Sequence, residues 1–379
     1  MTRVNAAFLH DPALIAVLDA IEGGGHRALL VGGCVRNALI GAAVSDVDIA
    51  TPAPPARVME LAKAAGLRPV PTGIDHGTVT VVSGGTGFEV TTFRRDVETD
   101  GRRAVVAFSD RIEDDAARRD FTMNALYAAR DGRVIDPVGG LPDLAARRLR
   151  FVGDARARIA EDYLRILRLF RFLAWYGRDV DRDAIVACTE LSAGLEKISA
   201  ERIGAELRKL LAAPDPCPAV ALMAQTGVLP HVLPGADPQA LPALIALEQA
   251  SRTAPDWPRR LALLTADTAH LRLSRPEAKA QDSLTKARNW PLEETAYRLG
   301  PAMATDAALI AAARGTPLPH DWRTIIDSAA PLPISAADLL PDLTGPALGR
   351  ALSAAETAWI ASGFTLPRAD LIAAAKAAP

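Results

Sequence analysis

Residues 30–51 have the sequence LVGGCVRNALIGAAVSDVDIAT, which gathers an apolar strand, a glycine turn and a cation in one short unit. The apolar residues Leu29 to Val31 predict a buried strand. The turn at Gly32 and Gly33 lets the backbone approach phosphate oxygens closely. Arg36 follows on a predicted helix and adds a fixed positive charge. This arrangement suits the binding of a nucleoside triphosphate.

Asp46 and Asp48 close this unit and are the candidate catalytic residues. A strand places residues i and i+2 on the same face, so both carboxylates can point at one spot. Paired carboxylates supply the hard oxygen ligands that Mg²⁺ prefers. A single acidic pair of this kind is more often a solvated loop, but the adjoining glycines and arginine favour a metal site. We therefore predict that Asp46 and Asp48 hold Mg²⁺ and that Gly32, Gly33 and Arg36 contact the nucleotide.

The bulk composition allows a large protein with an ordinary charge. The chain has 379 residues, which is enough for two or three domains, and 49% of them are hydrophobic. Charged residues make up 23% and the net charge is −2. A nucleic-acid partner therefore has to be held by a local basic face rather than by the total charge.

The cysteines and the N-terminus indicate a reducing compartment. Cys34, Cys188 and Cys217 are scattered and form no CxxC pair, so neither a disulfide framework nor a zinc site is expected. No secretory signal is recognisable at the N-terminus, and no uninterrupted apolar run is long enough to cross a membrane. We expect a cytoplasmic protein without a membrane partner. The oligomeric state is not predicted.

Periodicity divides the chain into three parts, predicted at 1–145, 146–215 and 216–379. The first part mixes strands and helices, and the rest is helical and rich in alanine and leucine. Prolines at 214, 216 and 218 mark the second boundary. Within the first part we predict helices at 12–23, 56–65 and 118–128, strands at 76–82 and 88–94 joined as a hairpin, a strand within 132–140, and a mobile charged loop between 94 and 105.

Two further clusters carry candidate binding residues. Arg118 and Arg119 follow the acidic run 113–115, so an ion-pair network and a forked contact to a triphosphate are equally good interpretations. In EDYLRILRLFRF, residues 161–172, one acid and three arginines recur every three residues along a predicted helix: Asp162, Arg165, Arg168 and Arg171. Asp162 can accept from an exocyclic amine while Arg165 donates to a ring nitrogen, a pattern that fits adenine or cytosine. The alternative is a helix whose arginines pair with acids of a neighbouring domain.

The motifs LVGGCVRN…DVDIAT, RRDFTMNAL, EDYLRILRLFRF and ERIGAEL, in this order, resemble the bacterial class II tRNA nucleotidyltransferase (CCA-adding enzyme) and poly(A) polymerase family. The resemblance covers about 28–212. It implies an α+β fold: a polymerase-β-like nucleotidyltransferase head with a small mixed sheet at 1–145, a helical neck at 146–215 and a helical body and tail at 216–379. It also implies CTP and ATP as substrates, the tRNA 3′ end as acceptor and Mg²⁺ as cofactor.

The resemblance assigns roles by position. Asp46 and Asp48 would hold the metal, and Gly33 and Arg36 would meet the phosphates. The implied nucleotide pocket contains Arg119 or Arg118, Asp162, Arg165, Arg168 and Arg171. Glu89 and Asn124 are accessory candidates. One departure stands out, because Asn37 replaces the family's usual aspartate and cannot form an ion pair.

The hypothesis from the sequence is a two-metal in-line transfer, in which the RNA 3′ hydroxyl attacks the α-phosphate of CTP or ATP. The charged segment 94–111 favours an enzyme able to add A. The alternatives are a poly(A) polymerase, an enzyme that adds only the terminal A, a nucleotidyltransferase for a small molecule or protein, and a non-catalytic RNA-binding protein on the same scaffold.

Overall fold

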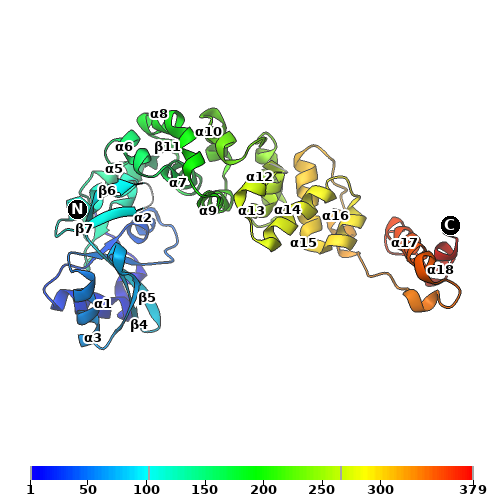
Figure 1. Cartoon of the computed structure of the whole chain (residues 1–379), viewed down its shortest axis with the longest axis horizontal. Coiled ribbons are helices and arrows are strands. Elements are labelled where there is room, and N and C mark those ends of the chain that lie inside the picture. Colours follow the sequence, from blue (N-terminus) through cyan, green and yellow to red (C-terminus); the bar gives the residue numbers. More distant parts are fainter. Residues whose placement is uncertain (1, 101–102, 265–266, 378–379) are drawn as a thin grey trace. The chain divides into compact units, whose positions relative to one another are not determined.

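The computed structural model describes residues 2–100, 103–264 and 267–377 (Figure 1). The chain forms two compact units. The first comprises Met1–Ser199 and Leu222–His231, and the second comprises Ala200–Ala221 and Val232–Pro379. The candidate site residues named above all belong to the first unit.

A mixed sheet organises the first unit. Within the described residues it has seven strands in the order β3-β4-β5-β2-β1-β8-β9, with β2 and β5 parallel and the other neighbours antiparallel. The strands are β1 (Leu29–Val31), β2 (Asp48–Thr51), β3 (Arg68–Gly73), β4 (Thr78–Ser83), β5 (Thr86–Thr92), β8 (Tyr127–Ala128) and β9 (Val134–Ile135). The predicted mixed sheet of an α+β protein is thus confirmed.

Two helices cover one face of this sheet. Helix α1 (Pro12–Gly23) packs against α3 (Pro55–Ala64), and both contact β4 and β5 (Figure 1). Asp11 caps α1 by accepting from the Ala13 amide at 2.9 Å, and Pro12 occupies the first helical position, where its missing N–H costs nothing. The helices predicted at 12–23 and 56–65 are therefore confirmed within a residue. The predicted β4–β5 hairpin is confirmed too.

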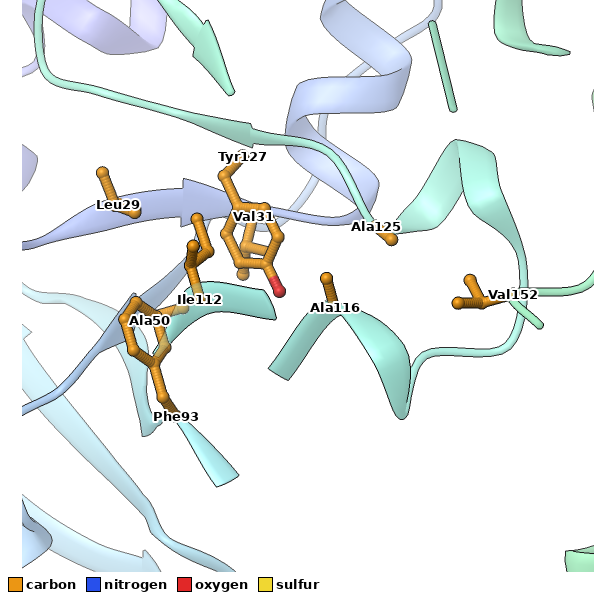
Figure 2. Packing of buried hydrophobic residues seen from close by; sticks show 9 residues of the cluster. All are labelled: Leu29, Val31, Ala50, Phe93, Ile112, Ala116, Ala125, Tyr127 and Val152. Atoms are coloured by element: carbon orange, nitrogen blue, oxygen red, sulfur yellow. The ribbon is translucent and has the colours of Figure 1, made fainter. Parts of the chain in front are cut away.

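A hydrophobic cluster packs around β1, β2 and β8 (Figure 2). Leu29 and Val31 point into it from β1, and Phe93 and Tyr127 meet there edge to face with ring centroids 6.5 Å apart. Helix α4 (Ile112–Ala117) supplies Ile112 and Ala116. Leu29 and Val31 of β1 point to this side of the sheet, and the buried Leu30 between them points to the other side.

Two segments between residues 94 and 128 differ from the elements predicted for them. The segment predicted as a loop from 94 to 105 pairs instead as β6 (Arg94–Asp100) with β7 (Arg103–Phe108). The helix predicted at 118–128 is absent from that described segment. Its place is taken by a 3₁₀ turn (Thr122–Asn124) and by β8, whose Tyr127 and Ala128 pair with β1. Pairing with a distant strand overrides the local helical pattern here.

Beyond residue 146 the chain is almost entirely helical, as predicted. A two-residue parallel pair, β10 (Arg148–Leu149) with β11 (Asp179–Val180), is the departure within this described region. The first unit continues with α5 (Gly140–Ala146), α6 (Ala155–Glu161), α7 (Leu164–Trp175), α8 (Arg182–Leu191) and a 3₁₀ segment (Ser192–Lys197). It also contains the last residues of α10 (Cys217–Gln225), from Leu222 onward, and most of α11 (Val228–Val232).

The second unit is built from helices and contains a cluster of buried charges. Its main helices are α9 (Ala200–Leu211), α12 (Leu241–Ala250), α13 (Trp257–Leu264), α14 (Arg275–Ala287), α15 (Leu292–Ala313), α16 (Trp322–Asp327), α17 (Gly345–Ala361) and α18 (Arg368–Lys376). Arg259 and Arg260 of α13 are fully buried and share Glu248 of α12. Arg260 also donates to the Leu211 carbonyl at 2.6 Å, which ties α9 to this core. None of the described helices combines the length and the apolar character that crossing a bilayer requires.

Candidate active site

Asp48 stands at the beginning of β2, in the centre of the sheet. Its strand neighbours are Val31 of β1 on one side and Glu89 of β5 on the other. The Asp48 side chain is half-buried. Burial raises its pKa first of all, and the nearby charges of Glu89 and Asp46 raise it further. Asp48 is therefore a carboxylate whose own surroundings disfavour its negative charge.

Asp46 precedes the strand rather than lying on it, because β2 begins only at Asp48. The expected i and i+2 strand geometry therefore does not apply to this pair. Asp46 is exposed and accepts from the Ser45 hydroxyl at 2.8 Å, yet its charge still acts on Asp48. No group of three or more acidic, histidine or cysteine side chains poised for a metal occurs among the described residues.

Gly32 forms the turn that joins β1 to α2 (Gly33–Ile40). Its φ of 71° is one that residues with a side chain rarely adopt. A Cβ atom at this position would lie 3.3 Å from the Arg119 guanidinium. Gly32 is thus needed both for the turn and for the close approach of Arg119, whereas Gly33 meets no such restriction.

Asp115 holds both arginines of the predicted triphosphate contact. Its two oxygens pair with Arg118 at 2.8 Å and with Arg119 at 2.9 Å, and it also accepts from the Tyr127 hydroxyl at 2.6 Å. Burial alone would raise the pKa of Asp115, but the two arginines lower it below its usual range. The ion-pair network is therefore present. Arg119 also lies close enough to Asp48 for its charge to lower the pKa of that carboxyl, so Arg119 is a neighbour of the acidic residues.

Arg36 is buried on α2 between amide oxygens and aromatic rings. Its Nη1 donates to Asn124 Oδ1 at 2.5 Å, and its Nε and Nη2 donate to Asn37 Oδ1 at 3.0 and 2.8 Å. Its guanidinium lies 4.0 Å from the ring centroid of Tyr176 and 5.1 Å from that of Phe172. Burial lowers the pKa of Arg36. Asn37 therefore orients Arg36 by hydrogen bonds from a neutral side chain. The faces of the two aromatic rings supply part of the electrostatic attraction that an aspartate at position 37 would give.

A polar chain continues from Arg36 to α7. Asn124 donates to Asp120 Oδ1 at 3.0 Å, and Asp120 Oδ2 forms an ion pair with Arg168 at 2.6 Å. Burial acts to raise the pKa of Asp120, but Arg168 and Asn124 lower it. Three motifs that are far apart in the sequence are thus joined side chain to side chain.

The helix predicted from 161 to 172 is broken at Asp162, where α6 ends and α7 has not begun. Asp162 accepts from the Leu164 amide at 3.1 Å. Arg165 donates to Glu161 and to the Arg158 carbonyl. Arg171 lies over the ring of Phe172, with 4.2 Å to the centroid. The three arginines of α7 therefore have different partners: Arg165 contacts Glu161, Arg168 pairs with Asp120, and Arg171 lies against Phe172.

Several side chains that organise the site were not among the candidate residues, although Asp115 belongs to the acidic run that was considered as an ion-pair partner of the arginines. Asp115, Asp120 and Glu161 carry the ion pairs, and the first two are almost fully buried. Arg158 donates to the Arg118 and Arg119 carbonyls and so fixes the backbone of the arginine pair. Asp120 lies within the motif RRDFTMNAL and Glu161 within EDYLRILRLFRF, so these motifs could have indicated both residues. Tyr176 lies outside the motifs.

Comparisons with known proteins agree with this geometry. Residues 28–150 match the family model described as the poly A polymerase head domain. Residues 179–239 match a model described as the probable RNA and SrmB-binding site of polymerase A. The sheet, the Gly32 turn and the polar chain up to Asn124 all lie within the first match.

The CCA-adding enzyme of Leuconostoc mesenteroides is 34% identical over 366 residues, which cover 90% of both chains. The chain belongs to the CCA-adding enzyme and poly(A) polymerase family. The mouse mitochondrial CCA tRNA nucleotidyltransferase 1 is 42% identical over 231 residues. That alignment spans 59% of this chain and about half of the mouse protein (51%), and other curated relatives are likewise matched over about half their length.

A solved structure supports the same family membership over most of the chain. The Bacillus stearothermophilus CCA-adding enzyme in complex with CTP is 29% identical, with a TM-score of 0.71 and 92% of each chain covered. The mouse relative is named as a nucleotidyltransferase, and enzymes of that class generally use divalent metal ions. The predicted family and fold class are thereby confirmed.

Proposed function

We propose that this protein transfers nucleotides from CTP and ATP to the 3′ end of tRNA and so builds or repairs the CCA end. The observation that carries the proposal is the position of Asp48, a half-buried carboxylate beside Asp46 and Glu89, next to the Gly32 turn and Arg119. A Leuconostoc relative that aligns over nearly the whole chain is named for CCA addition, and a related structure contains CTP.

The donor set at Asp48 fits a divalent cation. Asp46 and Asp48 would hold it, and Mg²⁺ suits their hard oxygen ligands. The fit is supported by the raised pKa of Asp48, which is caused first by burial and then by the charges of Glu89 and Asp46, since a bound cation would favour the ionised carboxylate. Such an ion, when bound, makes the RNA 3′ hydroxyl more acidic and neutralises phosphate charge.

The chain's own residues position the reactants. The Gly32 turn places backbone N–H groups at the start of α2, where an anionic phosphate is favoured. Gly33 and Arg36 are proposed to contact the phosphates, with Arg119 and Arg118 as forked donors held in place by Asp115. The side-chain contacts that link Arg36 through Asn124 and Asp120 to Arg168 would hold these cations at a fixed position relative to α7. Asn124 acts in this proposal as a positioning residue.

Base choice is proposed to lie at the α6–α7 junction. Asp162 and Arg165 would read the amine and the ring nitrogen shared by cytosine and adenine, and Arg168 and Arg171 would line the same pocket. Glu161 holds Arg165 in place. Replacing Arg165 with alanine should lower discrimination against UTP and GTP on the order of tenfold, the scale of one charged hydrogen bond.

The check on Arg165 is to compare kcat/KM for all four nucleoside triphosphates on a tRNA that lacks its terminal A. Arg57→Ala, on an exposed arginine that pairs with Glu60, is the matched control and should change nothing. A uniform loss for all four triphosphates would show that Arg165 binds phosphate instead.

The decisive experiment presents purified protein with tRNA ending before, within and after CCA, together with CTP, ATP or both, and sequences the 3′ ends. Addition of CC and then A, followed by a stop, is expected. A alone on a CC end would identify an A-adding enzyme, and long A tails would identify a poly(A) polymerase. No addition in any reaction would favour a non-RNA acceptor or a binding protein.

We also propose that the three predicted parts of the chain have separate functions. Catalysis would belong to residues 1–145, base recognition to 146–215 and tRNA binding to 216–379. A cytoplasmic location is also proposed, and it is supported by three cysteines that form no disulfide.

A further inference from the structure

Trp175, the last residue of α7, is a large aromatic side chain that remains 40% exposed. Arg168, Arg171 and Trp175 follow at spacings of three and four, which places them along one face of the helix. Trp175 lies ten residues beyond Arg165, or about 15 Å along the helix axis at the usual rise. A base read at Arg165 is therefore too far away to reach Trp175.

The surroundings of Trp175 are basic. Its neighbour Tyr176 lies under the guanidinium of Arg36, and the Tyr176 carbonyl accepts from Arg147 at 3.5 Å. Arg171 lies over Phe172, one turn earlier. The exposed Arg178 follows, with Asp179 as the adjoining exposed acid. Arg147, Arg171 and Arg178 thus lie near this end of α7.

Aromatic rings interleaved with arginines are typical of surfaces that bind single-stranded nucleic acid, because every base can stack and every phosphate can pair. A protein partner would instead favour a broader apolar area than one indole provides. The nucleotide-binding candidate Arg36 belongs to the same aromatic and cationic group. Because the base of the incoming triphosphate is proposed to be read at Arg165, about 15 Å away, a base that stacks at Trp175 would belong to the strand being extended.

We propose that the Trp175 indole stacks on a base of the single-stranded acceptor RNA, with the neighbouring arginines contacting its phosphates. This inference builds on the proposed function, since it names a subsite for the acceptor. Trp175 is the one tryptophan of the sequence that precedes residue 257, so its fluorescence reports on this place in the first unit.

The test compares Trp175→Ala and Trp175→Phe with the wild-type chain. Trp175→Ala should raise the Kd for a tRNA ending in CC, and its KM in the transfer reaction, roughly tenfold, the scale of one base–aromatic stack. Trp175→Phe should recover most of this loss because a phenyl ring still stacks. KM for CTP and ATP and the Tm should stay unchanged. Val186→Ala, an exposed apolar residue on α8, is the control and should have no effect.

The fluorescence arm separates this inference from the proposed function. Without any triphosphate, RNA should quench a part of the tryptophan emission that is missing in Trp175→Phe. Such quenching supports the subsite even if no nucleotide is added in any reaction. An unchanged RNA affinity in Trp175→Ala, an equal loss of RNA and CTP binding, or a change in mass by light scattering would overturn it, the last by indicating contact between two copies.

Discussion

Replacing Asp48 with asparagine is expected to abolish nucleotidyl transfer, lowering kcat on the order of a thousandfold or more. Asparagine has nearly the same shape but no charge, so a divalent cation loses its most enclosed ligand. The fold should survive, because burial and the nearby charges of Glu89 and Asp46 already disfavour the negative charge of Asp48. Single-turnover addition of radiolabelled CMP to a tRNA lacking CCA measures the loss, and circular dichroism follows the Tm.

The matched control is Glu60→Gln, which neutralises an exposed acid on α3 in the same unit. It should leave both the rate and the Tm unchanged. If Asp48→Asn retained more than a tenth of the wild-type rate, Asp48 could not be a metal ligand in the reaction. A large fall in Tm would instead assign Asp48 a structural role.

The largest loss of stability is expected from Arg260→Met in the second unit. Arg260 is fully buried, pairs with Glu248 at 2.6 Å and donates to the carbonyls of Leu211 and Ala213. Methionine fills much of the volume but leaves these acceptors without their donor. Breaking a buried pair by removing one partner typically costs about 3–5 kcal/mol. Urea unfolding followed by tryptophan fluorescence measures this, since four of the five tryptophans lie beyond residue 256.

Lys286→Met is the control for this prediction, because it removes an exposed ion pair with Asp282 on α14. An exposed pair of this type contributes about 0.3–0.5 kcal/mol, so the two variants should differ clearly. Equal effects would mean that the buried charges contribute no more than a surface pair. Because the chain has two units, the transition of the second unit has to be fitted separately.

The local patterns of the sequence were sufficient for several elements and for the family. Helix α1 was predictable because Asp11 and Pro12 mark its start and apolar residues recur along one face. The β4–β5 hairpin was predictable because Val and Thr alternate on both sides of a glycine turn. The acidic pair, the glycine turn and Arg36 lie within one short stretch, so their combination could be recognised without a structure.

The segment from 118 to 128 could not be assigned from its own residues. Its composition suits a helix, but Tyr127 and Ala128 pair with Val31 and Leu30 almost a hundred residues earlier. The sequence offered an ion pair between the acidic run 113–115 and the two arginines, but the same separation hid the third partner of Asp115, the tyrosine of β8. Contacts of this kind form only when β8 pairs with β1, so the local sequence does not predict them.

The sequence alone determined the family and the α+β class, and it supplied the candidate residues for the chemistry, because those signals lie in short runs with fixed spacing. Only the tertiary structure decided how these residues are held. It placed Tyr176 against Arg36, joined Asn124 through Asp120 to Arg168, and began β2 at Asp48 so that Asp46 lies outside the strand. The physical reason is that ion pairs and ring contacts act through space, so residues far apart in the chain can meet with no local pattern to announce it.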